Sequence, residues 1–293
     1  MRSVGFAFAV FAFSAASQAL DPKQMDAFRI HSQYAAIASY CTSHGSPCLN
    51  EWDRCVLALA GIKDQPAPAF RFQSPDNNDD SDNREPFDAV MSPPLTLGSR
   101  LLYKFSTYET HPWIGSEGYI AINDERKEII VAFGGSTVFT DWINDFRFWQ
   151  TDYVFLTDAR KVVSHSNDDG AYRVHAGMYD MYRQLVPLVV NRLADILKAN
   201  ATLASSYRLV STGHSLGAVM SSLFALDLRA HQLNTELSRL DALRHALPSN
   251  MPLSVFALAQ PRFANAHLMS YFDRVVSTGI EYIRVMNNHV SPL

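Results

Sequence analysis

The stretch YRLVSTGHSLGAVM, residues 207–220, decides the fold. It reads as a β-strand that runs into Gly213-His214-Ser215-Leu216-Gly217 and then opens a helix. A serine between two glycines at such a turn is the G-x-S-x-G pattern of a nucleophile elbow, in which glycines allow backbone to pass close by. The pattern predicts that Ser215 lies in a strained turn at the carboxyl edge of a sheet, with its hydroxyl lifted out. The Leu216 amide would then point to where an acyl oxygen becomes negative.

Strands and helices alternate on both sides of this stretch. Periodicity predicts helices at 21–41, 178–198, 216–231 and 266–272, and strands at 100–106, 118–122, 127–133, 207–212, 253–259 and 281–286. This alternation implies an α/β fold with a mostly parallel central sheet covered by helices on both faces. No repeat or interdomain linker is visible. We therefore expect one domain over residues 20–293.

Residues 1–19 have the features of a secretory signal peptide. Arg2 precedes the apolar run VGFAFAVFAFSAA (residues 4–16), and small residues at 17–19 provide a cleavage point. The alternative is a buried or anchoring helix, but the run is too short to span a bilayer. No other stretch is long and apolar enough to span one. We expect a secreted, extracellular chain without a transmembrane segment.

Composition narrows the partners of the chain. Of its 293 residues 18% are charged, the formal net charge is −4, and no basic stretch is present to neutralise phosphates, so no nucleic-acid partner is expected. The acidic segment 74–86 lacks the spaced ligands of a calcium loop. We expect no metal and no cofactor.

The chain has three cysteines, an awkward number for a secreted protein. Cys48 and Cys55 are candidates for a disulfide that closes a short loop, which leaves Cys41 over. Cys41 either pairs with a partner not yet identified or stays reduced and buried as a small hydrophobic residue.

Four segments in this order resemble the fungal, or class 3, lipases. They are the GHSLG elbow, a strand ending in FGGS (133–136) with DWINDF (141–146) after it, VHAGMY (174–179) before the long helix, and AQPR (259–262) after a strand. The resemblance runs from the early helix ending in Tyr40-Cys41 to the last strand. It implies an α/β-hydrolase fold and a serine ester hydrolase.

The resemblance also implies roles for particular residues. Ser215 would be the nucleophile, and Leu216 and Ser136 would supply the two oxyanion donors. The family usually carries Arg where Gly134 stands, a departure that would loosen this loop. Residues 138–146 match the family's lid, and their apolar stripe recurs at three- and four-residue intervals: Phe139, Trp142, Ile143 and Phe146. Such a stripe either opens onto a lipid surface or simply packs on the core.

A serine nucleophile needs a base and a carboxylate, which follow it in the order Asp, His in this fold. No Asp follows Asp273, and the family's Asp and His are absent from residues 286–293. We expect that this chain is C-terminally truncated and that the natural protein continues past Leu293 with the Asp, the His and the partner of Cys41. A gene model read through an intron at Val290-Ser291 would explain this. The alternative is a substitute base, for which His289 is the only histidine beyond the last strand.

Two classes of function remain open from the sequence. The leading hypothesis is a secreted triacylglycerol lipase that acts on lipid or ester substrates at a lipid–water interface through an acyl-enzyme on Ser215. Without the expected Asp and His, the chain as written is either inactive or uses a substitute base. A feruloyl esterase or a phospholipase A1 would use the same chemistry. The rival is a non-catalytic lipid-binding pseudoenzyme, which the missing Asp and His favour.

Overall fold

In the computed structural model, the described residues are 21–40, 99–108, 110, 115–135, 149–153, 171–233, 240–276 and 278–285. They form a six-stranded sheet in the order β1-β2-β3-β6-β7-β8. The strands are β1 (Ser99–Ser106), β2 (Glu117–Asn123), β3 (Glu128–Phe133), β6 (Arg208–His214), β7 (Leu253–Leu258) and β8 (Ile280–Val285). The pairs β1–β2 and β2–β3 are antiparallel, and the pairs from β3 to β8 are parallel. The predicted mostly parallel sheet is confirmed.

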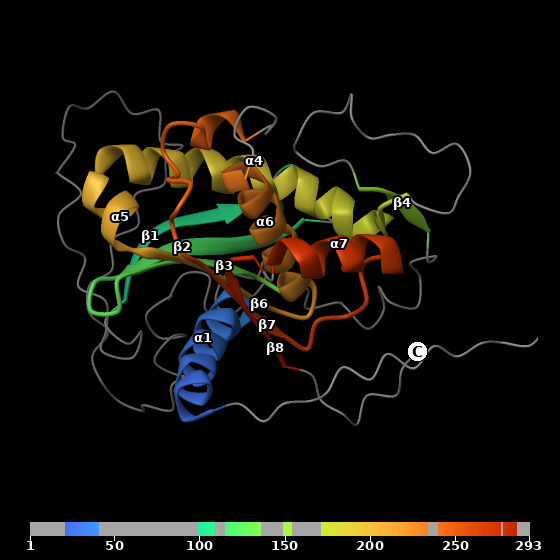
Figure 1. The fold of residues 1–293 in the computed structure, drawn as a ribbon, viewed down its shortest axis with the longest axis horizontal. Coiled ribbons are helices and arrows are strands. Elements are labelled where there is room, and N and C mark those ends of the chain that lie inside the picture. The colour runs from blue at the N-terminus through green and yellow to red at the C-terminus, as the bar shows by residue number, and fades with distance from the viewer. Residues whose placement is uncertain are drawn as a thin grey trace, which may run out of the picture.

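Helices cover both faces of this sheet (Figure 1). They are α1 (Pro22–Tyr40), α4 (Ala176–Ala199), α5 (Ala201–Ser206), α6 (Leu216–Leu233) and α7 (Ala266–Val276). In Figure 1, α1 lies on one side of the sheet, and α4 and α6 lie on the other. Helix α1 begins where the sequence predicts because the Asp21 carboxylate accepts the Gln24 N–H at 2.8 Å, and Pro22 occupies the first helical position.

Strand alternation divides the core into two. On β3, Ile129, Val131 and Phe133 pack in the larger cluster with α4, α6 and α7, whereas Ile130 and Ala132 pack in a smaller cluster with α1. Successive side chains on a strand point to opposite faces, so a continuous apolar run is what a doubly covered strand needs.

Two local features differ from the sequence-based expectation. A short hairpin of β4 (Gln150–Asp152) and β5 (Arg173–His175) precedes α4, and the sequence reading did not predict it. Sequence spacing predicts one apolar face of α4 with Met181, Leu185, Leu188, Val189 and Leu193, and all of these are buried except Leu188, which is 38% exposed. Adjacent helical positions lie about 100° apart, which carries Leu188 off the face that Val189 shares with Leu185.

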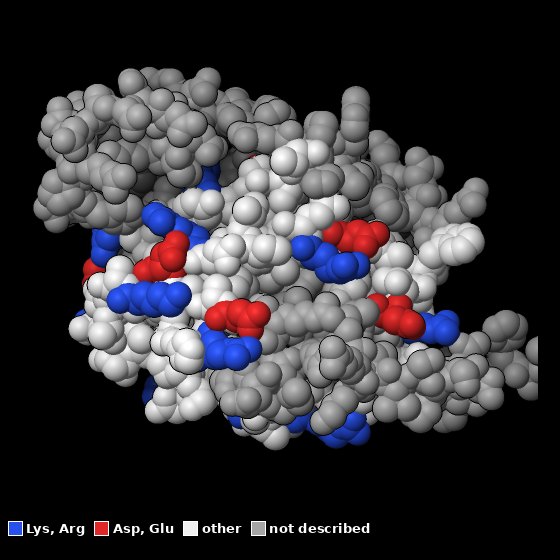
Figure 2. All heavy atoms as spheres, turned by 90° about the horizontal axis from the view of Figure 1, so that it is seen from above, with Lys and Arg blue, Asp and Glu red and all other residues white. Residues whose placement is uncertain are grey.

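Charges are intermixed on the face of the molecule that Figure 2 shows. In Figure 2, acidic and basic side chains sit beside one another on this face and do not gather into one basic patch. Within the described residues, no helix is long and apolar enough to cross a membrane.

Candidate active site

Residues 207–220 form the predicted nucleophile elbow, with β6 before Ser215 and α6 after it. Ser215 lies between the end of β6 and the start of α6 and has a positive φ of 55°. Its N–H donates to the Leu258 carbonyl at the end of β7, at 2.9 Å, and its own carbonyl accepts the Ala218 N–H at 3.1 Å. A serine in this left-handed region is strained, and the bonds to β7 and α6 hold it there.

The two glycines of the motif are required by close backbone contacts. A Cβ at Gly213 would lie 2.2 Å from the Gly217 carbonyl carbon, and a Cβ at Gly217 would lie 2.2 Å from the Phe133 oxygen. The elbow is thus pressed against the end of β3. The steric reason predicted for the G-x-S-x-G spacing holds in the structure.

Ser215 is less exposed than the sequence led us to expect. The residue is 8% exposed and therefore buried, whereas the motif predicts a hydroxyl lifted out of the turn. Leu216 begins α6, and its N–H has no hydrogen-bond partner among the described residues. An unpaired N–H at the first turn of an 18-residue helix is suited to stabilise an oxyanion.

The loop after β3 lies beside the elbow. Gly134 and Gly135 line a small hollow together with Leu216, and Glu117, Ser116, Gly115 and Tyr108 complete its wall. A Cβ at Gly134 would lie 2.9 Å from the Ala38 carbonyl of α1, so α1 leaves no room for the side chain that the family usually carries here. Ser136, the lid residues Phe139, Trp142, Ile143 and Phe146, and Cys48 and Cys55 lie outside the described residues.

Among the described residues, no histidine makes a hydrogen bond to Ser215. His214 precedes it in the elbow, and burial lowers the pKa of its half-buried ring, which keeps the ring neutral near pH 7. The ring of His175 caps α4 by accepting the Met178 N–H at 3.4 Å, which is a structural role. In the same part of the chain no group of three or more acidic, His or Cys residues could hold a metal ion.

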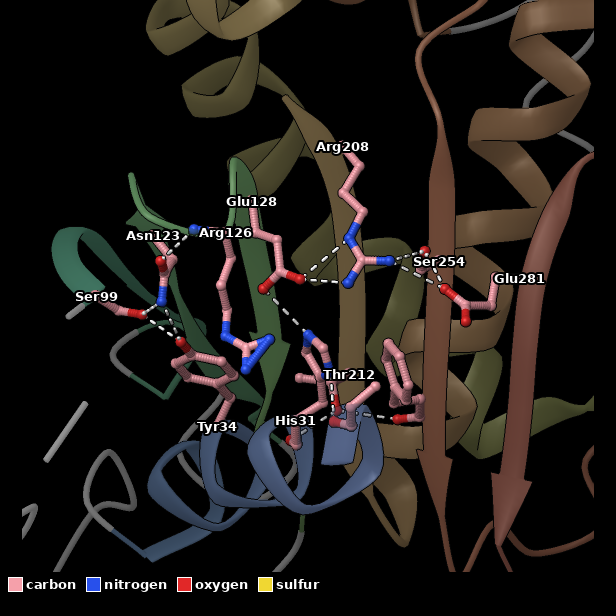
Figure 3. Close-up of polar contacts among 12 residues, drawn as sticks. His31, Tyr34, Ser99, Asn123, Arg126, Glu128, Arg208, Thr212, Ser254 and Glu281 are labelled. Carbon is pink, nitrogen blue, oxygen red and sulfur yellow. Dashed lines mark hydrogen bonds and ion pairs between the residues drawn. The ribbon is translucent and has the colours of Figure 1, made fainter. Parts of the chain in front are cut away.

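A polar network that sequence reasoning missed lies at the opposite, amino edge of the parallel strands (Figure 3). The His31 ring on α1 lies 3.2 Å from Glu128, and Glu128 also accepts from Arg208, whose Nε lies 3.0 Å away. Arg208 reaches on to Glu281 of β8 at 3.1 Å. Burial acts to raise the pKa of Glu128, but the hydrogen bonds and charges of His31 and Arg208 outweigh it, and the pKa is lowered.

A second missed group is Asp227, a carboxyl in the middle of α6 with 3% exposure. The hydroxyls of Tyr153 and Tyr182 both donate to it. Burial raises the pKa of Asp227 to about 7, because the cost of removing a carboxylate from water exceeds what the two hydrogen bonds return. Nothing in its local sequence, ALDL (225–228), distinguishes it from an exposed helical Asp.

A doubly covered, mostly parallel sheet with a strained serine between strand and helix defines the chain as an α/β-hydrolase. Residues 130–289, more than half of the chain, match the family model of class 3 lipases. The chain therefore belongs to the class 3 lipase family, a family of serine ester hydrolases.

Individual relatives agree with this assignment. The chain is 28% identical over 191 residues to phospholipase A1-IIgamma of Arabidopsis thaliana and 30% identical over 182 residues to a lipase of Rhizopus niveus. Each match covers 60% of this chain, but it covers only 41% and 38% of those relatives, so the chain spans about two fifths of their length. The crystal structure of the lipase from Rhizopus microsporus var. chinensis has the same fold, with a TM-score of 0.58, 23% identity, and coverage of 93% of this chain and 69% of that one.

Proposed function

We propose that the protein is a secreted triacylglycerol lipase that forms an acyl-enzyme on Ser215. The observation that carries the proposal is the strained elbow, which holds a serine directly before α6 and beside the Leu216 N–H, a donor that has no partner among the described residues. Ser215 Oγ attacks the ester carbonyl and its proton passes to a base. Leu216 and Ser136 stabilise the resulting oxyanion, the alcohol leaves, and water then releases the fatty acid.

The base is the open element of this proposal, since none of the described residues provides it. A fluorophosphonate probe applied to the full chain, with Ser215→Ala as control, decides between an enzyme and a non-catalytic lipid binder. Labelling of the wild-type chain that disappears in the variant is the expected result. An unlabelled wild-type chain refutes the hydrolase and favours the lipid-binding pseudoenzyme.

A lipid substrate is supported by an exposed aromatic side chain that follows the predicted lid in the sequence. Trp149, which follows residues 138–146 in the sequence, is 62% exposed, and its carbonyl accepts the Ala176 N–H at the start of α4. An exposed Trp on a fixed backbone is a suitable anchor at a lipid–water interface. We expect faster hydrolysis of emulsified triacylglycerol than of a dissolved short-chain ester, and Trp149→Ser should remove most of that difference.

Phospholipase A1 activity is the second candidate, because two relatives with that name are 28% and 26% identical to this chain. The two activities are distinguished by measuring fatty-acid release from phosphatidylcholine vesicles and from triacylglycerol emulsions with the same protein preparation. Release of fatty acid from the vesicles alone would overturn the triacylglycerol assignment while leaving Ser215 as nucleophile. Secretion is tested separately: expression from Met1 in a fungal host should yield an extracellular chain that begins at Leu20.

A further inference from the structure

The last turn of α1 contacts the loop beside the elbow. Ser39 is 5% exposed, and its Oγ accepts the Gly135 N–H at 3.0 Å. The same hydroxyl donates to the Ala35 carbonyl one turn back in the helix, also at 3.0 Å. Because its only proton is committed to Ala35, a lone pair of Ser39 Oγ is fixed toward the Gly135 amide.

Three elements enclose Gly134 and Gly135. The Gly134 N–H donates to the Glu117 carbonyl of β2 at 2.7 Å. On the far side, a Cβ at Gly135 would lie 2.9 Å from the carbonyl of His214, the residue before the nucleophile. The loop is therefore held between α1, β2 and the elbow, and Ser39 accepts the hydrogen bond that links the loop to α1.

Helix α1 is itself attached to the strand that carries the elbow. The Thr212 hydroxyl of β6 lies 3.2 Å from the His31 carbonyl, and the His31 ring stacks on Phe256 with ring centres 3.9 Å apart (Figure 3). Both ring nitrogens of His31 face acceptors, the Ala27 carbonyl at 2.6 Å and the Glu128 carboxylate at 3.2 Å. Through these two contacts the ring joins α1 to Glu128 of β3.

We propose that Ser39 is a positioning residue for the oxyanion site. By holding the Gly135 amide, it fixes the backbone that leads directly into Ser136, the proposed second donor, while β6, the strand that ends in the elbow, packs on the same helix. This inference rests on the proposed function. Oxyanion donors act only where charge develops in the transition state, so a small displacement of the loop lowers the rate of acylation more than it lowers substrate binding.

The test compares the full wild-type chain with Ser39→Ala and with Ser254→Ala as a matched control. Ser254 is also a buried serine hydroxyl, 3% exposed, but it donates to Glu281 at the amino edge of the sheet, at 3.0 Å. The measurements are kcat and KM on a dissolved p-nitrophenyl ester, the rate of fluorophosphonate labelling, and hydrogen exchange of a peptide that contains Gly135. For Ser39→Ala we expect kcat and labelling to fall about 10-fold with KM nearly unchanged, and exchange to quicken at Gly135. Ser254→Ala should change neither rate.

Two results would overturn the inference. One is equal labelling of wild-type and Ser39→Ala at a temperature where both are folded, and the other is an equal loss in Ser254→Ala, which would make the effect one of stability. If Ser39→Ala does not fold, Ser39→Cys replaces it with the same expected direction, because a thiol is a weaker acceptor of similar size. An unlabelled wild-type chain refutes the proposed function and this inference together, whereas a labelled wild-type chain with unaffected Ser39 variants refutes the inference alone.

Discussion

Asp227→Asn should remove a large pH dependence from the stability of the protein. The carboxyl has a pKa of about 7 in the folded chain against an ordinary value of 3.8, so between these values the folded state holds a proton that the unfolded state has lost. Stability from this group is therefore complete below pH 4 and falls as the pH rises toward 7. Linkage over that difference gives a loss on the order of 3 kcal/mol between pH 5 and pH 8. The amide that replaces the carboxyl does not titrate, and one oxygen and one NH₂ group can still bond to the hydroxyls of Tyr153 and Tyr182.

The assay is urea unfolding of the wild-type chain and Asp227→Asn at a series of pH values from 5 to 8. All other titrating groups are shared, so the difference between the two free energies of unfolding isolates Asp227. We expect this difference to move by roughly 3 kcal/mol in favour of the variant as the pH rises. Parallel curves for the two proteins would refute the reasoning, since they would mean that burial does not hold a proton on Asp227.

Three further predictions concern the elbow and the amino edge. Ser215→Gly should raise the free energy of unfolding, measured in urea, by roughly 1 kcal/mol, because glycine adopts φ 55° without strain. Ser215→Ala keeps the strain and should not raise it. An equal gain in both variants would contradict the strain at Ser215. Gly217→Ala should lower stability by about 2 kcal/mol or more and abolish labelling, because its Cβ would meet the Phe133 oxygen at 2.2 Å; a stable, reactive variant would show that the contact can relax. Glu128→Gln should lower stability by about 3 kcal/mol at pH 7, since it leaves His31 and Arg208 without their carboxylate. Because the pKa of Glu128 is lowered on folding, its contribution to stability is present above its ordinary pKa and is lost in acid. The difference in the free energy of unfolding between wild type and Glu128→Gln should therefore narrow below about pH 4. A difference that stays constant with pH would count against the pairing of Glu128 with His31 and Arg208.

The fold could be predicted from the sequence because its longer elements carry their own periodic signals. Helix α4 and strands β3, β6 and β7 lie where apolar spacing places them, within a few residues. The hairpin of β4 and β5 could not be found this way, because three-residue strands are too short to show a period of two. Its pairing joins Gln150 to His175, and nothing local to either strand records that partner.

The candidate site divides in the same manner. Ser215, Leu216 and the two glycines belong to one contiguous motif, so their conformation is encoded within five residues and could be predicted. Ser39 and Gly135 are 96 residues apart, and His31 and Glu128 are 97 apart. A serine or histidine within an apolar helix is compatible with many environments, so only the packing of α1 on the sheet identifies what these side chains bind. The reduced exposure of Ser215 depends in the same way on what surrounds it, which the motif does not encode.

Two of the left-handed residues follow neighbouring parallel strands at the edge that carries the elbow. Positive φ occurs at Ser215 after β6 and again at Ala259 after β7, and each of these residues donates its N–H to the next strand, Ser215 to Leu258 and Ala259 to Val285. The left-handed turns are therefore held by main-chain bonds across three neighbouring strands, and they would relax if those strands could slide. At the amino edge Arg208, the first residue of β6, is paired with Glu128 at the start of β3 and with Glu281 in β8. The main-chain pairing from β3 to β8 sets the register that these turns need, and the Arg208 pairs add side-chain links between the same strands at the amino edge.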